Sequence, residues 1–296
     1  MNEGTPAGAY DAAFTAFQRY STYDFRDLTV RTSTGTEQPG RLYAKLWSFS
    51  AGAANGRFAS TFALFPLIPD PSTASRYYVK KFELAGINPQ NFFRFITNSR
   101  GTTASATDFT VSRRSRTVAS GFTDFPEYEN FVQNPDPAIW LSAATPTFSV
   151  QSVAPFCGST GSGQMAFTTT STVAGQLIIT IDLDGTAGYQ AGGRDVVVEK
   201  AVAAGTTTVV WNGLDGLGTP APSGTAVPLG FKSGAAPVNF PVVDAENNVG
   251  GFRIEDVRPG TGFDVLFWND SNLSATAFPA PQANLSGVLS SGGVHD

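Results

Sequence analysis

Residues 176–184 read QLIITIDLD, and this stretch decides the fold class of the chain. Its apolar side chains recur at every second position, which is the pattern of a β-strand with one buried face; they are Leu177, Ile179, Ile181 and Leu183. Further apolar segments lie on both sides of this stretch at a spacing of roughly ten residues. They are residues 164–170, 194–201, 206–211, 225–231, 238–243, 252–257 and 263–268. Short strands at this spacing are typical of a β-sandwich, so we predict one in this half of the chain.

The composition extends this prediction to the rest of the chain. Apolar residues make up 41% of the sequence and aromatic residues 12%, which is too much for a disordered chain. Charged residues reach only 15%, too few for a helical bundle, while 31 glycines and 19 prolines supply many turns. Further strands are expected at 42–49, 57–65, 76–84, 91–97 and 147–153. We therefore predict an all-β protein.

A short flexible segment divides the predicted strands into two groups. Residues 157–163 read CGSTGSG, and such small, uncharged residues are typical of a linker. We predict an N-terminal β-sandwich over residues 1–155 and a second β-sandwich over residues 156–270. The final residues, 271–296, are rich in Ala, Pro and Ser and lack apolar periodicity, so we expect a loosely structured tail.

Counts of a few residue types exclude several functions. Only one histidine, His295, and one cysteine, Cys157, are present, so a multi-histidine or cysteine-rich zinc site cannot be built. A serine or cysteine protease would have to use His295, the last residue but one of the sequence. The net charge of −5 argues against nucleic acid, and no apolar run is long enough to span a membrane. Cys157 fits either a free buried thiol or a disulfide with a partner outside the sequence.

One turn sequence is specific enough to suggest a family. Residues 211–225 read WNGLDGLGTPAPSGT, with Trp211 at the end of an expected strand and Asn-Gly and Asp-Gly pairs that turn the chain. The pattern resembles the W-(D/N)-G-x-D-x-x-G-x-x-x-P-x-G motif of the immunoglobulin-like domain of flagellar hook-capping proteins. The resemblance implies that the second sandwich is immunoglobulin-like.

A wider resemblance surrounds this motif. Residues 181–185, 188–192, 239–248 and 266–271, in that order, are similar to a segment of the very large surface proteins of gliding bacteria exported by type IX secretion. Residues 40–49 resemble the domain before that segment. The resemblance implies a secreted, cell-surface structural protein, an adhesin or filament component, whose partners are copies of itself or neighbouring modules. Residues 1–8 lack the features of a signal peptide, so we expect an export signal outside this sequence.

Three acidic residues form a candidate calcium site. Asp182 and Asp184 lie two positions apart on a strand, so they project from one face, and the following loop returns to Asp195. Three carboxylates and loop carbonyls could supply several of the oxygens that calcium requires. The loop is no EF-hand, because Gly193 occupies the position of the bidentate glutamate. The alternative interpretation is that these residues end strands and cap turns without an ion.

Two other functions remain open at this point. A carbohydrate-binding module would use exposed tryptophans as stacking platforms, with Trp47, Trp140 and Trp268 as candidates. A carboxylate-based polysaccharide hydrolase would need a pair such as Glu127 with Glu129, or Asp244 with Glu246.

The basic cluster at residues 113–116 fits either an acidic glycan or a blunted edge strand. The resemblance supplies no catalytic residues. We therefore predict no catalysis and a structural or adhesive role.

Overall fold

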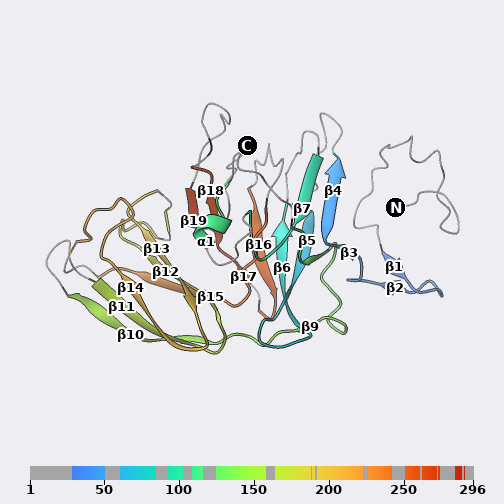
Figure 1. Cartoon of the computed structure of the whole chain (residues 1–296), viewed down its shortest axis with the longest axis horizontal. Helices are drawn as coiled ribbons and strands as arrows, with labels where there is room; N and C mark the ends of the chain where they lie inside the picture. Colours follow the sequence, from blue (N-terminus) through green and yellow to red (C-terminus); the bar gives the residue numbers. More distant parts are fainter. Residues whose placement is uncertain are drawn as a thin grey trace.

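The computed structural model describes residues 29–50, 61–84, 92–102, 109–115, 125–157, 164–187, 189–190, 192–222, 224, 226–241, 251–260, 262–271, 273, 284–288 and 290. Within these residues the chain is all-β, as predicted, with one helical turn, α1 (Phe109–Ser112). No helix among them is long and apolar enough to cross a membrane. The strands form two packed units, which stand side by side in Figure 1.

The first unit is built on one large sheet, which we call the main sheet. Its strands lie in the order β17-β16-β6-β5-β8-β3, and β9 pairs with β6 in parallel. Their bounds are β3 (Tyr43–Ala44), β5 (Ala63–Pro69), β6 (Arg76–Glu83), β8 (Glu129–Phe131), β9 (Leu141–Ser142), β16 (Arg253–Arg258) and β17 (Gly262–Phe263). A two-stranded sheet of β4 (Leu46–Ser50) and β7 (Phe92–Ile96) contributes Phe93 and Phe95 to a shared core with it.

The core of this unit is a cross-strand row of apolar side chains. Phe82 on β6 lies opposite Leu64 on β5 and Ile254 on β16, so three strands place large residues side by side. The Phe95 ring packs edge-on against the Phe82 ring, with 5.6 Å between centroids. Phe240 packs against both rings. This row links strands from distant parts of the chain into one core.

The second unit is a sandwich of two three-stranded antiparallel sheets. One sheet holds β10 (Phe148–Cys157), β11 (Gln164–Ser171) and β14 (Gly205–Trp211), and the other holds β13 (Val196–Val202), β12 (Gly175–Ile181) and β15 (Leu229–Gly234). Leu177, Ile179 and Ile181 are fully buried between the sheets, so the alternating pattern of residues 176–184 is confirmed. The immunoglobulin-like form of the sandwich stays a prediction.

The division into domains differs from the predicted one. The expected boundary at residues 155 and 156 falls inside β10, and residues 158–163 join β10 to β11, which are paired in one hairpin. The second boundary, at residue 270, is also wrong, because β16 pairs with β6 and therefore belongs to the main sheet. The sandwich is thus inserted between β9 and β16. We call β3–β9 and β16–β19 the host unit, and β10–β15 the inserted sandwich.

The prediction of a loose tail over residues 271–296 is wrong for one segment. Asn284–Val288 form β19, which pairs with β18 (Leu266–Asn269). A Cβ atom on Gly287 would lie 3.2 Å from Val197 Cγ2, so this hairpin also lies against β13 of the inserted sandwich. The segment has little apolar periodicity because a two-stranded hairpin against another unit needs few apolar side chains of its own.

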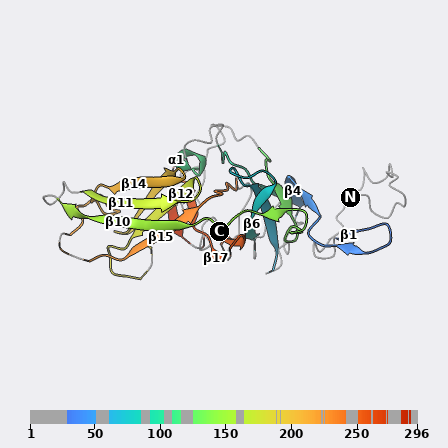
Figure 2. The same ribbon diagram turned by 90° about the horizontal axis from the view of Figure 1, so that it is seen from below.

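A second hairpin marks the opposite end of the molecule. It consists of β1 (Val30–Arg31) and β2 (Glu37–Gln38), whose described residues are half-buried or exposed. Figures 1 and 2 show it beyond β4, at the far side of the host unit from the inserted sandwich. The host unit therefore lies between this hairpin and the inserted sandwich.

Charged pairs hold the two units together. Arg113, just after α1, donates to Glu199 of β13 at 2.5 Å and lies over the Phe267 ring of β18 at 4.7 Å from its centroid. Lys232 of β15 contacts Asp264 of the host unit at 2.7 Å. Because these pairs involve different edges of the inserted sandwich, they fix its orientation on the host unit.

Candidate functional site

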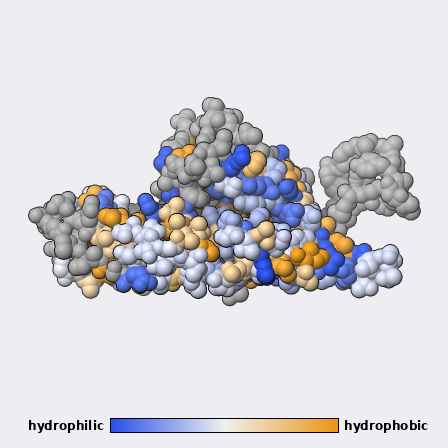
Figure 3. All heavy atoms as spheres, turned by 60° about the horizontal axis from the view of Figure 1, so that its bottom comes forward, coloured by the Kyte–Doolittle hydropathy of each residue, from blue (hydrophilic) through white to orange (hydrophobic). Residues whose placement is uncertain are grey.

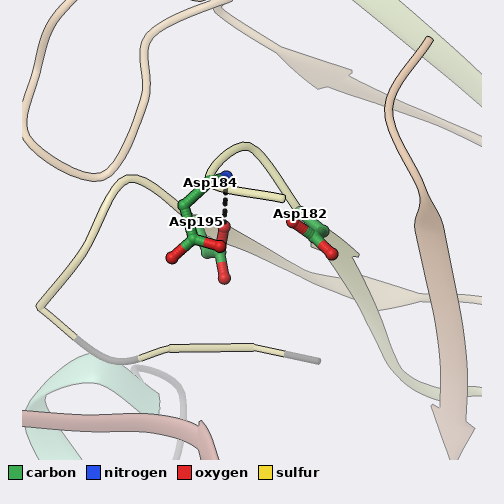
Figure 4. A group of neighbouring side chains, drawn as sticks. All are labelled: Asp182, Asp184 and Asp195. Atoms are coloured by element: carbon green, nitrogen blue, oxygen red, sulfur yellow. Dashed lines mark hydrogen bonds between the residues drawn. The ribbon is translucent and has the colours of Figure 1, made fainter. Parts of the chain in front are cut away.

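The three predicted acidic residues meet at one end of the inserted sandwich. Asp182 and Asp184 follow β12 and Asp195 precedes β13, and their carboxylate oxygens lie within 4.8 Å of one another. Asp195 is buried, Asp182 is half-buried and Asp184 is exposed. Figure 4 shows the Asp184 and Asp195 carboxylates close together, with Asp182 to one side at the end of β12.

Asp195 organises the loop between β12 and β13. One of its carboxylate oxygens accepts hydrogen bonds from the backbone N–H groups of Leu183 at 2.8 Å and Asp184 at 3.2 Å. The other accepts from the N–H of Gln190 at 2.9 Å. A single buried carboxylate thus holds both ends of the loop, and the turn-capping interpretation is confirmed for this residue.

The other two carboxylates have smaller roles. Asp182 accepts a hydrogen bond from the N–H of Gly185 at 3.1 Å, and Asp184 accepts one from the N–H of Thr186 at 2.7 Å. Each closes a local turn and leaves its second oxygen without a bond of this kind among the described contacts. The geometry therefore brings together the three oxygen donors that the sequence predicts for calcium, and ion binding itself stays a prediction.

The turn motif at residues 211–225 lies directly against this acidic loop. Asp215 accepts hydrogen bonds from the N–H groups of Leu217 at 3.1 Å and Thr219 at 2.8 Å, and from Arg194 Nε at 2.9 Å. The Arg194 guanidinium, followed by these backbone donors, holds the pKa of the Asp215 carboxyl below its usual range. The motif aspartate is therefore a buried cap that joins the turn to residue 194.

Trp211 and Gly216 complete this arrangement. The Trp211 indole N–H donates to the carbonyl of Leu214 at 2.8 Å while its ring packs in the sandwich core. Gly216 donates its N–H to the carbonyl of Arg194 at 2.9 Å, and a Cβ atom there would collide with the carbonyl oxygens of Gly193 and Asp195. The motif and the acidic loop thus form one structural element, a relation that the separate sequence patterns did not reveal.

No protein family, curated protein or solved structure matches the chain.

The tryptophans proposed as sugar platforms are engaged in packing. Trp47 is packed against the main core and donates its indole N–H to the carbonyl of Asn130 at 2.8 Å. Trp140 lies edge-on to Phe131, with ring centroids 4.7 Å apart. Trp268 lies in β18 opposite Leu285 and is half-buried. All three residues are half-buried.

The proposed hydrolase residues are only partly described. Glu127 accepts hydrogen bonds from both the N–H and the hydroxyl of Ser99 at 2.7 Å, so it holds a turn. Burial, and to a lesser extent the Glu127 charge, raises the pKa of the neighbouring Tyr128 to about 12. Glu129 is half-buried in β8. Asp244, Glu246 and His295 lie outside the described residues, and so does the side chain of Cys157.

The described part of the basic cluster does not lie in an edge strand. Arg113 and Arg114 follow the helical turn α1 rather than lying within an edge strand, and Arg113 contacts Glu199 of the inserted sandwich. The backbone of Arg114 pairs with that of Asn269 in β18 as an isolated β-bridge, and Arg114 is exposed. Arg113 therefore joins the two units, whereas Arg114 pairs within the host unit.

We predict that Asp195→Asn lowers the free energy of unfolding by about 2 kcal/mol, because an amide nitrogen would replace an oxygen that accepts backbone hydrogen bonds. Asp184→Asn is the matched control. Its side chain is exposed and Asn keeps one accepting oxygen, so we expect a change within about 0.5 kcal/mol. Chemical denaturation of the wild type and both variants in chelator measures this difference. Equal losses would show that Asp195 does not hold the loop.

The calcium hypothesis predicts that millimolar Ca²⁺ raises the melting temperature relative to chelator. Binding only to the folded state at 100 times Kd would add about 2.7 kcal/mol of stability. Asp184→Asn removes one carboxylate oxygen and its negative charge with little structural cost, so it should reduce the shift. An identical melting temperature with Ca²⁺ and with chelator would leave the three carboxylates with turn capping alone.

Proposed function

We propose that the chain is a non-catalytic structural or adhesive module of a secreted, cell-surface protein. The observation that carries this proposal is the attachment of the inserted sandwich to the host unit at several points. Both of its chain ends return to the host unit, and ion pairs at Arg113 and Lys232 fix two of its edges. The sandwich thus forms a fixed arm, and its sheet of β10, β11 and β14 is available for contacts.

The chemistry of the buried polar groups supports the same role. Asp195, Asp215 and Asn130 are buried, and each is engaged in hydrogen bonds that hold backbone segments together. Residues used in this way increase rigidity, which a load-bearing or adhesive module needs. In Figure 3 strongly hydrophilic residues gather over the host unit, while the sandwich end is mostly pale, with near-neutral hydropathy.

Localisation and adhesion together test this proposal. On intact cells of the natural producer, we expect an antibody against the inserted sandwich to label the surface. Deletion of the coding region should reduce attachment to surfaces or to neighbouring cells. Retention of the protein inside the cell, or unchanged attachment after deletion, would contradict the proposal. Release of sugar from a polysaccharide by the purified chain would instead favour the hydrolase.

A further inference from the structure

The strand β14 has an unusually open edge. It pairs with β11 over seven consecutive residue pairs, from Gly205 with Ser171 to Trp211 with Met165, without a register shift. Among the described residues no strand pairs with its other edge. Its sequence, GTTTVVW, contains neither charge nor proline. A long, regular and uncharged edge is a template for pairing with another strand.

Several other strands at sheet edges carry features that prevent such pairing. β10 has two register shifts against β11 and contains Pro155. β3 and β17 are only two residues long. β13 and β15 carry Glu199 and Lys232, whose side chains contact the host unit. β14 is therefore distinguished from these edges by its length, its regularity and its lack of charge.

The side chains of β14 suit pairing with an identical strand. Thr206, Thr208 and Val210 project to the outer face and are exposed, whereas Val209 and Trp211 are buried in the core. In an antiparallel pair centred on Thr208, this residue would face its own copy and Thr206 would face Val210. Cross-strand pairs of β-branched residues stabilise a sheet. No like charges would meet, although the chain as a whole carries a net charge of −5.

The next strand continues the same uncharged surface. Thr168 and Thr170 of β11 lie opposite Thr208 and Thr206, and the hydroxyls of Thr170 and Thr206 are 3.3 Å apart. A second copy approaching the β14 edge would thus meet hydroxyl and methyl groups instead of charges. Charged partners would find no complementary group on this face, which favours a second copy as the occupant.

We propose that β14 pairs with the β14 strand of a second copy of this chain, antiparallel and centred on Thr208. The two three-stranded sheets then form one continuous sheet across a two-fold axis. Main-chain hydrogen bonds supply the attraction, as in other cases of strand addition. This inference rests on the proposed structural role and names its partner, since each fixed arm would join two copies.

Sedimentation velocity of the full chain over a range of concentrations tests this pairing. We expect a concentration-dependent dimer for the wild type. Thr208→Lys places two ammonium groups face to face across the axis and should weaken association at least ~10-fold. Thr168→Lys is the matched control, because it adds the same charge to the same face one strand further from the axis, and its dimer should persist.

A wild-type chain that stays monomeric at all concentrations would overturn the inference, and so would a dimer unaffected by Thr208→Lys. Circular dichroism and melting curves establish that the lysine variants are folded. A partner strand from another protein, found on β14 of a monomeric chain, would also overturn it.

Cross-linking provides a second readout that does not depend on adding charge. Thr208→Cys in a Cys157→Ser background should be joined by a short thiol-reactive linker, because residues opposite each other in an antiparallel pair lie close together. The same substitution at Thr168 should react far less. Absence of a cross-link at Thr208 would overturn the pairing but leave the cell-surface role intact, whereas a cytoplasmic dimer would contradict only the proposed function.

Discussion

Replacing Lys80 with methionine is expected to lower the free energy of unfolding by about 3 kcal/mol, since the change removes a buried ammonium and leaves Asp256 without this partner and Asp264 with Lys232 alone. Lys80 lies on β6 with only 6% of its surface exposed. Its ammonium donates to Asp256 at 2.7 Å and to Asp264 at 2.5 Å. Asp264 also contacts Lys232, so the loss extends to the junction with the inserted sandwich.

The neighbouring residue provides a control on the same strand. Lys81 contacts Glu83 at 2.6 Å and Glu255 at 3.5 Å, but its side chain and those of both partners are about one-third exposed. Exposed pairs contribute at most about 1 kcal/mol, so Lys81→Met should cost no more than that. Denaturant unfolding of both variants measures the difference. Equal losses would contradict the central role assigned to the Lys80 cluster.

The pH dependence of the Lys80 variant follows from the charges around Asp264. Burial alone would raise the pKa of Asp264, but Lys80 and Lys232 together hold it well below its usual range. This carboxylate therefore stabilises the wild type above the unfolded pKa of about 4, and the stabilisation is lost as pH falls towards the folded pKa. Without Lys80 the pKa of Asp264 rises, so the penalty of Lys80→Met should be largest at neutral pH and shrink in acid.

Replacing Phe82 with alanine is expected to lower the free energy of unfolding by about 3–5 kcal/mol, because the change opens a cavity in the core of the host unit. The Phe82 side chain is 1% exposed and lies between Leu64 and Ile254 in the cross-strand row. Its ring also packs against Phe95 and Phe240. The surrounding side chains come from separate segments of the chain, so they cannot easily collapse into the space.

Ile254→Ala tests whether β16 belongs to the same folding unit. Calorimetry should show that both Phe82→Ala and Ile254→Ala lower the transition of the host unit, with a cost of about 2–5 kcal/mol for the isoleucine. Val210→Ala, on the exposed outer face of β14, should change stability by no more than about 0.5 kcal/mol. A loss confined to the transition of the inserted sandwich after Ile254→Ala would contradict the observed main sheet.

The sequence predicts strands well here but not their assignment to sheets. The alternation over residues 176–184 correctly identifies β12, because every second side chain there must be buried. The same kind of pattern over residues 252–257 indicates a strand, yet it carries no information about whether that strand pairs with β15 or with β6. Likewise, residues 157–163 have the composition of a linker, but hairpin turns and domain linkers use the same small residues.

The candidate site shows the same limit at the level of side chains. Asp182, Asp184 and Asp195 are close in sequence, and strand geometry is sufficient to predict that they gather. The contact between Arg194 and Asp215 depends on how the motif turn docks, and Lys80 and Asp264 are separated by 184 positions. Such pairs become visible only when the topology is known.

The insertion of the sandwich between β9 and β16 also determines the order in which the protein can form during synthesis. β5 and β6 leave the ribosome early, but the strand that completes their sheet follows only after the entire sandwich has been made. Until then, the edge of β6 that will receive β16 is open. The sandwich contains all of its own pairing partners and can fold first. A nascent chain can therefore hold a folded inserted sandwich beside an incomplete host unit, and the last strands to emerge complete the main sheet.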